Sequence, residues 1–413
     1  MEERSLRVYN SEKTFFSKIT NTLTKFLIPT KVGINGMLIS MKRNNVLKAY
    51  ENSLNLDKVE DEDKKEQITK KLDDAYALYL ESIDKYIMDS IYKKVKNDTA
   101  NEFEKDALSQ YYMITHLKET GYTEYKYRKQ MYLLRLDYET VANEKTKILD
   151  RYKKFYAMEM EILYKGILKH YSIRLAENLS DGEKQDIYNK IFKTLENYIS
   201  NILPLKFEIE GNDTYKEILD EYNNFERFSV GKLDQNDFIE KNMILLGLSR
   251  KLFTHSLPLV VAEQCYEKLL NDVRSLIVDT KIIKKQEKAY SLLISIIEEY
   301  NVKLLSTKIY WDKPVLREEY KAFWNEYKNL DILKDKDYDE YIKDKEILFI
   351  QNDLKKVLVN ENKYYKIIKF YKNKLVELGA MRALVDECYS EGNYTKGAKK
   401  VAKRRGRRPK VAV

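Results

Sequence analysis

Glycine, proline and cysteine are all scarce in this chain of 413 residues, which contains 12, 5 and 2 of them. Turn-rich all-β chains and collagen-like chains depend on glycine and proline, so both classes are excluded. The two cysteines, Cys265 and Cys388, are far apart and belong to no CxxC pair, which leaves no disulfide framework and no zinc site. No apolar run reaches about eighteen residues, and the polar N-terminus lacks the apolar core of a secretory signal. The sequence therefore predicts no transmembrane segment.

Hydrophobic residues make up 43% of the chain and charged residues 34%, so a core can form beneath a strongly polar surface. Apolar residues recur at intervals of three and four over most of the length, which is typical of amphipathic helices. We therefore predict an all-α fold, an elongated bundle of many helices. The predicted helices cover residues 11–28, 37–52, 62–96, 99–121, 123–179, 180–202, 214–228, 235–254, 257–279, 281–309, 315–333, 338–359 and 361–378, with a short last helix to about 390.

The longest predicted helix, residues 123–179, contains one glycine and no proline. Ten of its residues are spaced alternately three and four apart, as in the heptads of a coiled coil. They are Met131, Leu134, Tyr138, Val141, Lys145, Ile148, Tyr152, Phe155, Glu159 and Ile162. A continuous helix of this length would be roughly 80 Å long at ~1.5 Å per residue, so we expect it to pack on other long helices.

Local signals set several helix ends. Thr99–Glu102 and Ser180–Glu183 have the spacing of capping boxes, and Gly121 and Gly379 stand where helices stop. Only one short segment alternates between apolar and polar residues as a strand does. Its apolar residues are Leu205, Phe207 and Ile209.

These elements suggest four regions. We predict an N-terminal helical segment at 1–56, a long-helix or coiled-coil region at 57–203, a compact helical domain at 204–392 and a disordered basic tail at 393–413. No internal repeat of fixed period is apparent, although recurring helix–loop–helix units could hide a degenerate one.

The net charge of +9 lies entirely in the last eighteen residues, which contain no acid. The rest of the chain carries equal numbers of basic and acidic side chains. Such asymmetry predicts a tail that binds a polyanion. The predicted nucleic-acid contacts are Lys396, Lys399, Lys400, Lys403, Arg404, Arg405, Arg407, Arg408 and Lys410.

Stacking aromatics are absent after Tyr394, which favours contact with the phosphate backbone of a duplex or of structured RNA. Arg405–Pro409 resembles the AT-hook core Arg-Gly-Arg-Pro, with one additional arginine before the proline, and the preceding lysines and alanines resemble a linker-histone tail. The resemblance implies DNA rather than RNA as the partner. The alternatives are an anionic membrane, an acidic protein, a nuclear localisation signal or a purely solubilising tail.

The stretch from Asp335 to Glu346 resembles an EF-hand calcium loop. Acids occupy its first, third, fifth and twelfth positions, and Ile342 occupies the apolar eighth. The sixth position is Glu340, where the turn requires glycine. A solvated helix start explains the same residues, and we predict no metal and no cofactor.

No catalytic motif stands out. His116, His170 and His255 are isolated, and no HExxH, GxSxG, GxGxxG or Walker-type loop occurs. Carboxylates are so numerous that pairing any two of them from the sequence would be arbitrary. An enzyme would need a site assembled only in three dimensions.

Two helices have alternative interpretations. Tyr364, Ile368 and Tyr371 share a face near many lysines, which fits either an aromatic nucleic-acid surface or a buried stripe beneath solvated lysines. The amphipathic helix 11–28 fits either a membrane surface or packing against the protein.

We therefore predict a non-enzymatic structural or assembly protein that contacts nucleic acid through its tail, as in a viral, phage or other nucleoprotein particle. We expect homo- or hetero-oligomers formed through the long helices. The predicted location is the cytoplasm or a virion, or the nucleus in a eukaryote. The alternatives are a DNA-binding regulatory protein and an enzyme without a recognisable motif.

Overall fold

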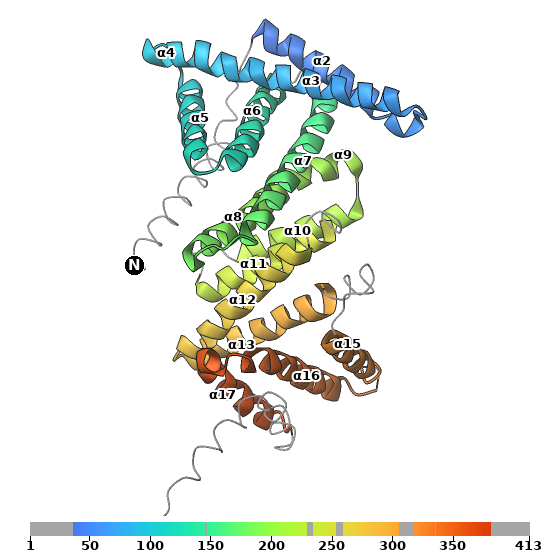
Figure 1. Ribbon diagram of the computed structural model, residues 1–413, viewed down its shortest axis with the longest axis vertical. Coiled ribbons are helices and arrows are strands. Elements are labelled where there is room, and N and C mark those ends of the chain that lie inside the picture. The colour runs from blue at the N-terminus through green and yellow to red at the C-terminus, as the bar shows by residue number, and fades with distance from the viewer. Residues whose placement is uncertain are drawn as a thin grey trace, which may run out of the picture. The chain divides into compact units, whose positions relative to one another are not determined.

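The computed structural model describes residues 36–144, 147–228, 234–252, 259–304, 318–334 and 336–380 (Figure 1). Several predictions concern residues outside these ranges. They include the helix 11–28, Lys145 of the heptad series, the break near Trp311, His255, the short last helix to about 390, Cys388 and the basic tail, together with the first residue of the EF-hand-like stretch, Asp335.

The described residues form helices and turns and no strand, which confirms the all-α prediction. The chain divides into two compact units, one from Met1–His170 with Pro204–Gly211 and the other from Tyr171–Leu203 with Asn212–Val413. The domain boundaries predicted at 56, 203 and 392 stay a prediction.

The first unit has its core between paired helices. The long helix α3 packs on α2, and α5 packs on α6 (Figure 1). Fully buried side chains such as Val46, Ile83, Leu134 and Phe155 fill the space between them. The helices of this unit are α2 (Met37–Ser53), η1 (Leu56–Lys58), α3 (Glu62–Tyr86), η2 (Ile87–Ile91), α4 (Tyr92–Lys96), α5 (Glu102–Thr120), α6 (Tyr122–Glu144), most of α7 (Leu149–Leu175) and nearly all of α9 (Leu203–Glu210).

In the second unit, too, helices that follow one another in the chain pack together. Its α12 packs on α13, α15 on α16, and α16 on α17. Leu195, Val273, Leu293 and Phe349 are among its fully buried residues. Its helices are α8 (Asp181–Asn201), α10 (Asp213–Phe228), α11 (Gln235–Leu252), α12 (Leu259–Asp279), α13 (Ile283–Ile297), η3 (Glu298–Leu304), α15 (Glu318–Asp331), α16 (Tyr338–Leu358) and α17 (Glu361–Glu377).

Most predicted helices are confirmed, with ends shifted by a few residues. The predicted helices 62–96 and 281–309 each contain a π-helical segment, η2 and η3 respectively. Among the described residues, none of the helices combines the length and the apolar character needed to cross a membrane.

The prediction of one continuous helix over 123–179 is wrong. Helix α6 ends at Glu144, and α7 begins at Leu149. The Tyr138 ring stacks on the Tyr156 ring with centroids 4.1 Å apart, which places α7 back against α6. In a straight helix these residues would be about 27 Å apart. The heptad spacing persists across the turn because both helices bury apolar faces in the same core.

The predicted strand at Leu205–Ile209 is also wrong, because these residues belong to α9. Pro204 occupies the first turn of that helix, where the missing N–H costs no intrahelical hydrogen bond. Lys206 pairs with Glu161 and Lys153 pairs with Glu208, which fixes α9 against α7. Three alternating apolar residues are too few to separate a strand from a short helix.

The predicted helix caps are partly right. Ser180 and Glu183 form the capping box with their reciprocal side-chain bonds, and Gly379 takes the left-handed conformation, φ +76°, directly after the C-cap. The box at Thr99 is displaced, because the capping pair is Asn101 and Glu104. Gly121 is extended, with φ −177°, so it ends α5 without a left-handed turn.

Candidate functional site

All nine predicted nucleic-acid contacts, Lys396 to Lys410, lie outside the described residues. The nearest described element along the chain is α17. Its aromatic stripe is structural, since Ile368 and Tyr371 are buried and the Arg274 guanidinium lies 5.8 Å from the centre of the Tyr364 ring. The stripe interpretation is therefore correct, and the aromatic nucleic-acid surface is not formed by these residues.

The opposite side of α17 is basic and open to solvent. Lys363, Lys366 and Lys369 are exposed at intervals of three residues, and Tyr365 beside them is 63% exposed. The Lys363 amino group lies 5.2 Å from the centre of the Tyr364 ring, which holds one of the three lysines near the helix. This surface has the charge needed to contact phosphates.

The EF-hand-like stretch forms no calcium loop in its described part. Helix α16 begins at Tyr338, so the positions that should curve around an ion follow a helical course instead. The Asp337 carboxylate caps this helix by accepting a hydrogen bond from the Glu340 N–H at 3.0 Å, and Glu346 accepts one from the Tyr290 hydroxyl. The helix-start interpretation is the one observed.

The isolated histidines and the buried cysteine form no site in the described chain. His116 lies on α5 and His170 on α7, without a second histidine one turn away. Burial raises the pKa of the Cys265 thiol to about 12, which keeps it protonated and unreactive at neutral pH. Within the ranges that the structure describes, no group of three or more histidine, cysteine or carboxylate residues could hold a metal ion.

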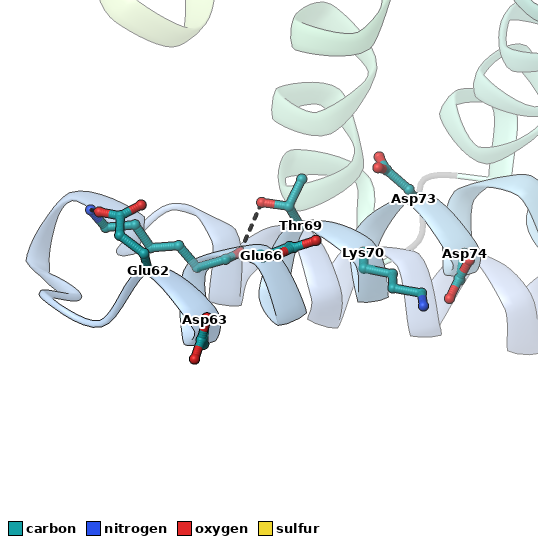
Figure 2. A pocket seen from close by; sticks show the side chains of 8 residues that line it. Glu62, Asp63, Glu66, Thr69, Lys70, Asp73 and Asp74 are labelled. Carbon is teal, nitrogen blue, oxygen red and sulfur yellow. Dashed lines mark hydrogen bonds and ion pairs between the residues drawn. The ribbon is translucent and has the colours of Figure 1, made fainter.

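Figure 2 shows a shallow hollow whose lining comes entirely from the first half of α3. Five carboxylates and two lysines surround it, and the Thr69 hydroxyl donates to the Lys65 carbonyl at 3.0 Å. Neighbouring charges along one helix produce this arrangement. The lining residues are Glu62, Asp63, Lys65, Glu66, Thr69, Lys70, Asp73 and Asp74.

A buried ion pair lies at the centre of the first unit. Arg43 of α2 donates from Nε and Nη2 to the two carboxylate oxygens of Asp137 on α6, at 2.7 and 2.6 Å. Arg43 is 4% exposed and Asp137 is fully buried. The Tyr79 hydroxyl of α3 also donates to Asp137 and lies 2.6 Å from the Tyr152 hydroxyl of α7. We call these four residues the first buried cluster.

The second unit contains a similar cluster around Asp353, with one arginine and one tyrosine bound to the carboxylate. Arg274 of α12 donates from Nε and Nη2 to the two Asp353 oxygens at 3.0 and 2.5 Å, and the Tyr371 hydroxyl of α17 donates at 2.6 Å. Arg274 Nη1 also donates to Asn271 at 2.9 Å. We call Arg274, Asp353 and Tyr371 the second buried cluster.

Lys356 lies beside the second buried cluster, one turn after Asp353. Its amino group donates to Asn301 at 3.1 Å and lies 4.9 Å from the centre of the Tyr300 ring. Burial lowers the pKa of Lys356, and the Arg274 charge lowers it further, while the Asp353 charge opposes both. The surroundings of Lys356 therefore disfavour its protonated form.

In both buried clusters the hydrogen bonds of the carboxylate are made within the chain. Each carboxylate accepts three hydrogen bonds from the same chain, which satisfies the charge that burial would otherwise penalise. Burial raises the pKa values of Tyr79 and Tyr371, so both hydroxyls remain protonated donors.

Sequence reasoning missed both clusters. Arg43 and Asp137 are separated by 94 residues, and Arg274 and Asp353 by 79. The only local signal is a charged residue at a position where the apolar period places the buried face.

Comparison with known proteins gives no relative on which function could be based. No protein-family model matches the chain, and neither a curated protein nor a solved structure matches it.

Proposed function

We propose that the protein is a non-enzymatic helical assembly protein that contacts nucleic acid through Lys396–Lys410, as a component of a viral, phage or other nucleoprotein particle. One observation supports the proposal. Nine cations and no acid fall within the last eighteen residues, whereas residues 1–395 carry equal numbers of basic and acidic side chains. Counterion release from the phosphate backbone makes such a segment a strong polyanion ligand.

The exposed lysines of α17 support the proposal. Lys363, Lys366 and Lys369 add three cations on a helix that precedes the tail in the chain. The buried Arg43 and Arg274 are excluded from this role, because internal carboxylates already neutralise them.

The test is duplex DNA binding at several salt concentrations by the full chain and by a chain ending at residue 395. The tail should contribute up to about −0.9 to the slope of log K against log salt for each phosphate that it engages. The truncated chain should lose most of both affinity and slope. Equal slopes for the two chains would contradict the proposal.

Two controls sharpen the result. Glutamine at Lys363, Lys366 and Lys369 should remove at most about three phosphates from the slope, a smaller loss than truncation causes. Replacing A·T-rich DNA by G·C-rich DNA or by structured RNA separates minor-groove preference from general phosphate binding.

Selection from random sequences tests the regulatory alternative, because a regulator enriches a motif and an assembly protein does not. A compact monomer at high concentration would count against assembly.

A further inference from the structure

Three helices of the structure carry the same spacing of polar residues. In α3, in α8 and across α13–η3, a tyrosine is followed eight positions later by an acid and ten positions later by a second tyrosine. The three sets are Tyr76, Asp84 and Tyr86; Tyr188, Glu196 and Tyr198; and Tyr290, Glu298 and Tyr300. We call Asp84, Glu196 and Glu298 the anchor acids.

The buried face of these helices has the same register in all three. Counted from the first tyrosine, the residues three, six, seven and eleven positions later are buried in every copy. They are Tyr79, Ser82, Ile83 and Ile87; Ile191, Thr194, Leu195 and Ile199; and Leu293, Ile296, Ile297 and Asn301. A shared register means that each helix turns the same side towards its neighbours.

Each anchor acid forms an ion pair with a lysine on a later helix. Asp84 pairs with Lys129 of α6 at 2.8 Å, Glu196 with Lys241 of α11 at 2.5 Å, and Glu298 with Lys345 of α16 at 3.3 Å. The degree of burial also agrees, because the three acids are 30, 33 and 31% exposed and the lysines 22, 15 and 14%.

The helix between acid and lysine supplies a tyrosine near the same acid. The Tyr111 hydroxyl of α5 donates to Asp84 at 2.6 Å, and the Tyr222 hydroxyl of α10 donates to Glu196 at 3.4 Å. In the third set, Tyr327 of α15 lies near enough to Glu298 to feel its charge, but its hydrogen bond is with Tyr341. Burial, a hydrogen bond with Tyr341 and the Glu298 charge together raise the pKa of Tyr327.

We infer that α3 with α5 and α6, α8 with α10 and α11, and α13–η3 with α15 and α16 are three copies of one helical repeat, each closed by an ion pair between an acid of its first helix and a lysine of its last. Lysines and acids are abundant here, so one such ion pair would mean little. The inference rests on the spacing, the buried register and the ion pair, which agree in all three copies.

The helices of the three copies all lie within residues 62–358, so the inference does not depend on the tail. This inference stands or falls on the folding of these residues, whether or not the tail binds DNA.

The test is a graft in the full chain. Residues 188–198 are replaced by the sequence of residues 290–300, which keeps both tyrosines and the anchor acid in register. The matched control uses the sequence of residues 289–299, shifted by one position. The control moves the acid from position 196 to 197 and places a glutamate at position 198, where the tyrosine is 1% exposed.

Thermal unfolding followed by circular dichroism gives the readout. The in-register graft should keep Tm within about 5 °C of the parent, and the shifted graft should lower Tm far more or abolish folding. Lys241→Met should then lower Tm equally in the parent and in the in-register graft. The inference is overturned if the two grafts behave alike, whether both fold or both fail, or if Lys241→Met affects only the parent.

Discussion

The first and second buried clusters place the same three donors on a buried carboxylate, yet their surroundings differ. Asp137 and Asp353 each receive two bonds from one arginine and one from one tyrosine. In the first cluster the tyrosine continues to a second hydroxyl, that of Tyr152. In the second, a second cation, Lys356, lies close enough to feel both charges.

The presence of Lys356 beside only one of the two clusters should make their electrostatics respond differently to pH. Arginine keeps its proton at any ordinary pH, so the charge balance of the first cluster is fixed. Lys356, whose pKa is lowered, can lose its proton, so the charge beside the second buried cluster can change without unfolding. The contribution of the first buried cluster to stability should therefore not change with pH, whereas the contribution of the second buried cluster should.

The largest expected effect comes from neutralising the carboxylates. Asp137→Asn and Asp353→Asn each leave a buried guanidinium without its counter-charge, and each should lower the free energy of unfolding by about 3–5 kcal/mol. For Asp353→Asn the loss should be smaller at pH 10 than at pH 7, because the pKa of Lys356 is lowered and a less protonated Lys356 repels Arg274 less. Urea unfolding at both pH values measures the difference.

Asp89→Asn and Asp220→Asn serve as matched controls, one in each unit. Both aspartates are exposed, so each change should alter the free energy of unfolding by no more than about 0.5 kcal/mol. A loss for Asp137→Asn that shrinks with pH as much as the loss for Asp353→Asn would refute the assigned role of Lys356.

The next effect concerns Glu159 on α7, a buried acid of the first unit. Burial, followed by the nearby Asp73 charge, raises the pKa of Glu159 to about 7. The folded state therefore holds this proton more tightly than the unfolded state, whose pKa is about 4.3. The resulting stability is complete below pH 4 and is lost as pH rises through 7.

Glu159→Gln should remove this pH dependence. The glutamine variant should be more stable than the parent at pH 8, by on the order of 3 kcal/mol, and nearly equal to it at pH 4. The sign is opposite to that of Lys356, whose lowered pKa makes stability increase with pH. Equal stability of parent and variant at pH 8 would show that Glu159 is solvated.

Local features of the fold could be predicted from the sequence, and contacts over long distances could not. The Ser180–Glu183 capping box and the turn at Gly379 depend on a few neighbouring residues, so their signals are complete in the sequence. The end of α6 could not be predicted from the sequence, because the apolar residues before and after the turn continue the same spacing. The Tyr138–Tyr156 stacking that records the turn is a tertiary contact.

The buried clusters and the repeat were missed for related reasons. Nothing in the sequence distinguishes Asp137 or Asp353 from the other carboxylates until the helices bring an arginine to each. The repeat escaped a search for a fixed period because the anchor acids stand at 84, 196 and 298, at unequal intervals. The spacing within one helix is retained because packing constrains it, whereas the connections between helices vary in length.

The smallest expected effect distinguishes the tyrosines of the two buried clusters. Tyr371→Phe removes one hydrogen bond to a buried carboxylate, which should cost about 1.5 kcal/mol. Tyr79→Phe removes the equivalent bond to Asp137. It also removes the hydroxyl that hydrogen-bonds with the hydroxyl of Tyr152, a fully buried residue. The first unit should therefore lose about 1 kcal/mol more than the second, because a buried hydroxyl is left without that partner.

The double variant Tyr79→Phe with Tyr152→Phe isolates this term. Removing both hydroxyls leaves no orphaned group, so the double variant should be no less stable than Tyr79→Phe alone. Urea unfolding of the three variants and the parent provides the comparison. A further loss in the double variant would mean that Tyr152 contributes through another contact, and the hydroxyl pair would then not explain why the first cluster depends more strongly on its tyrosine.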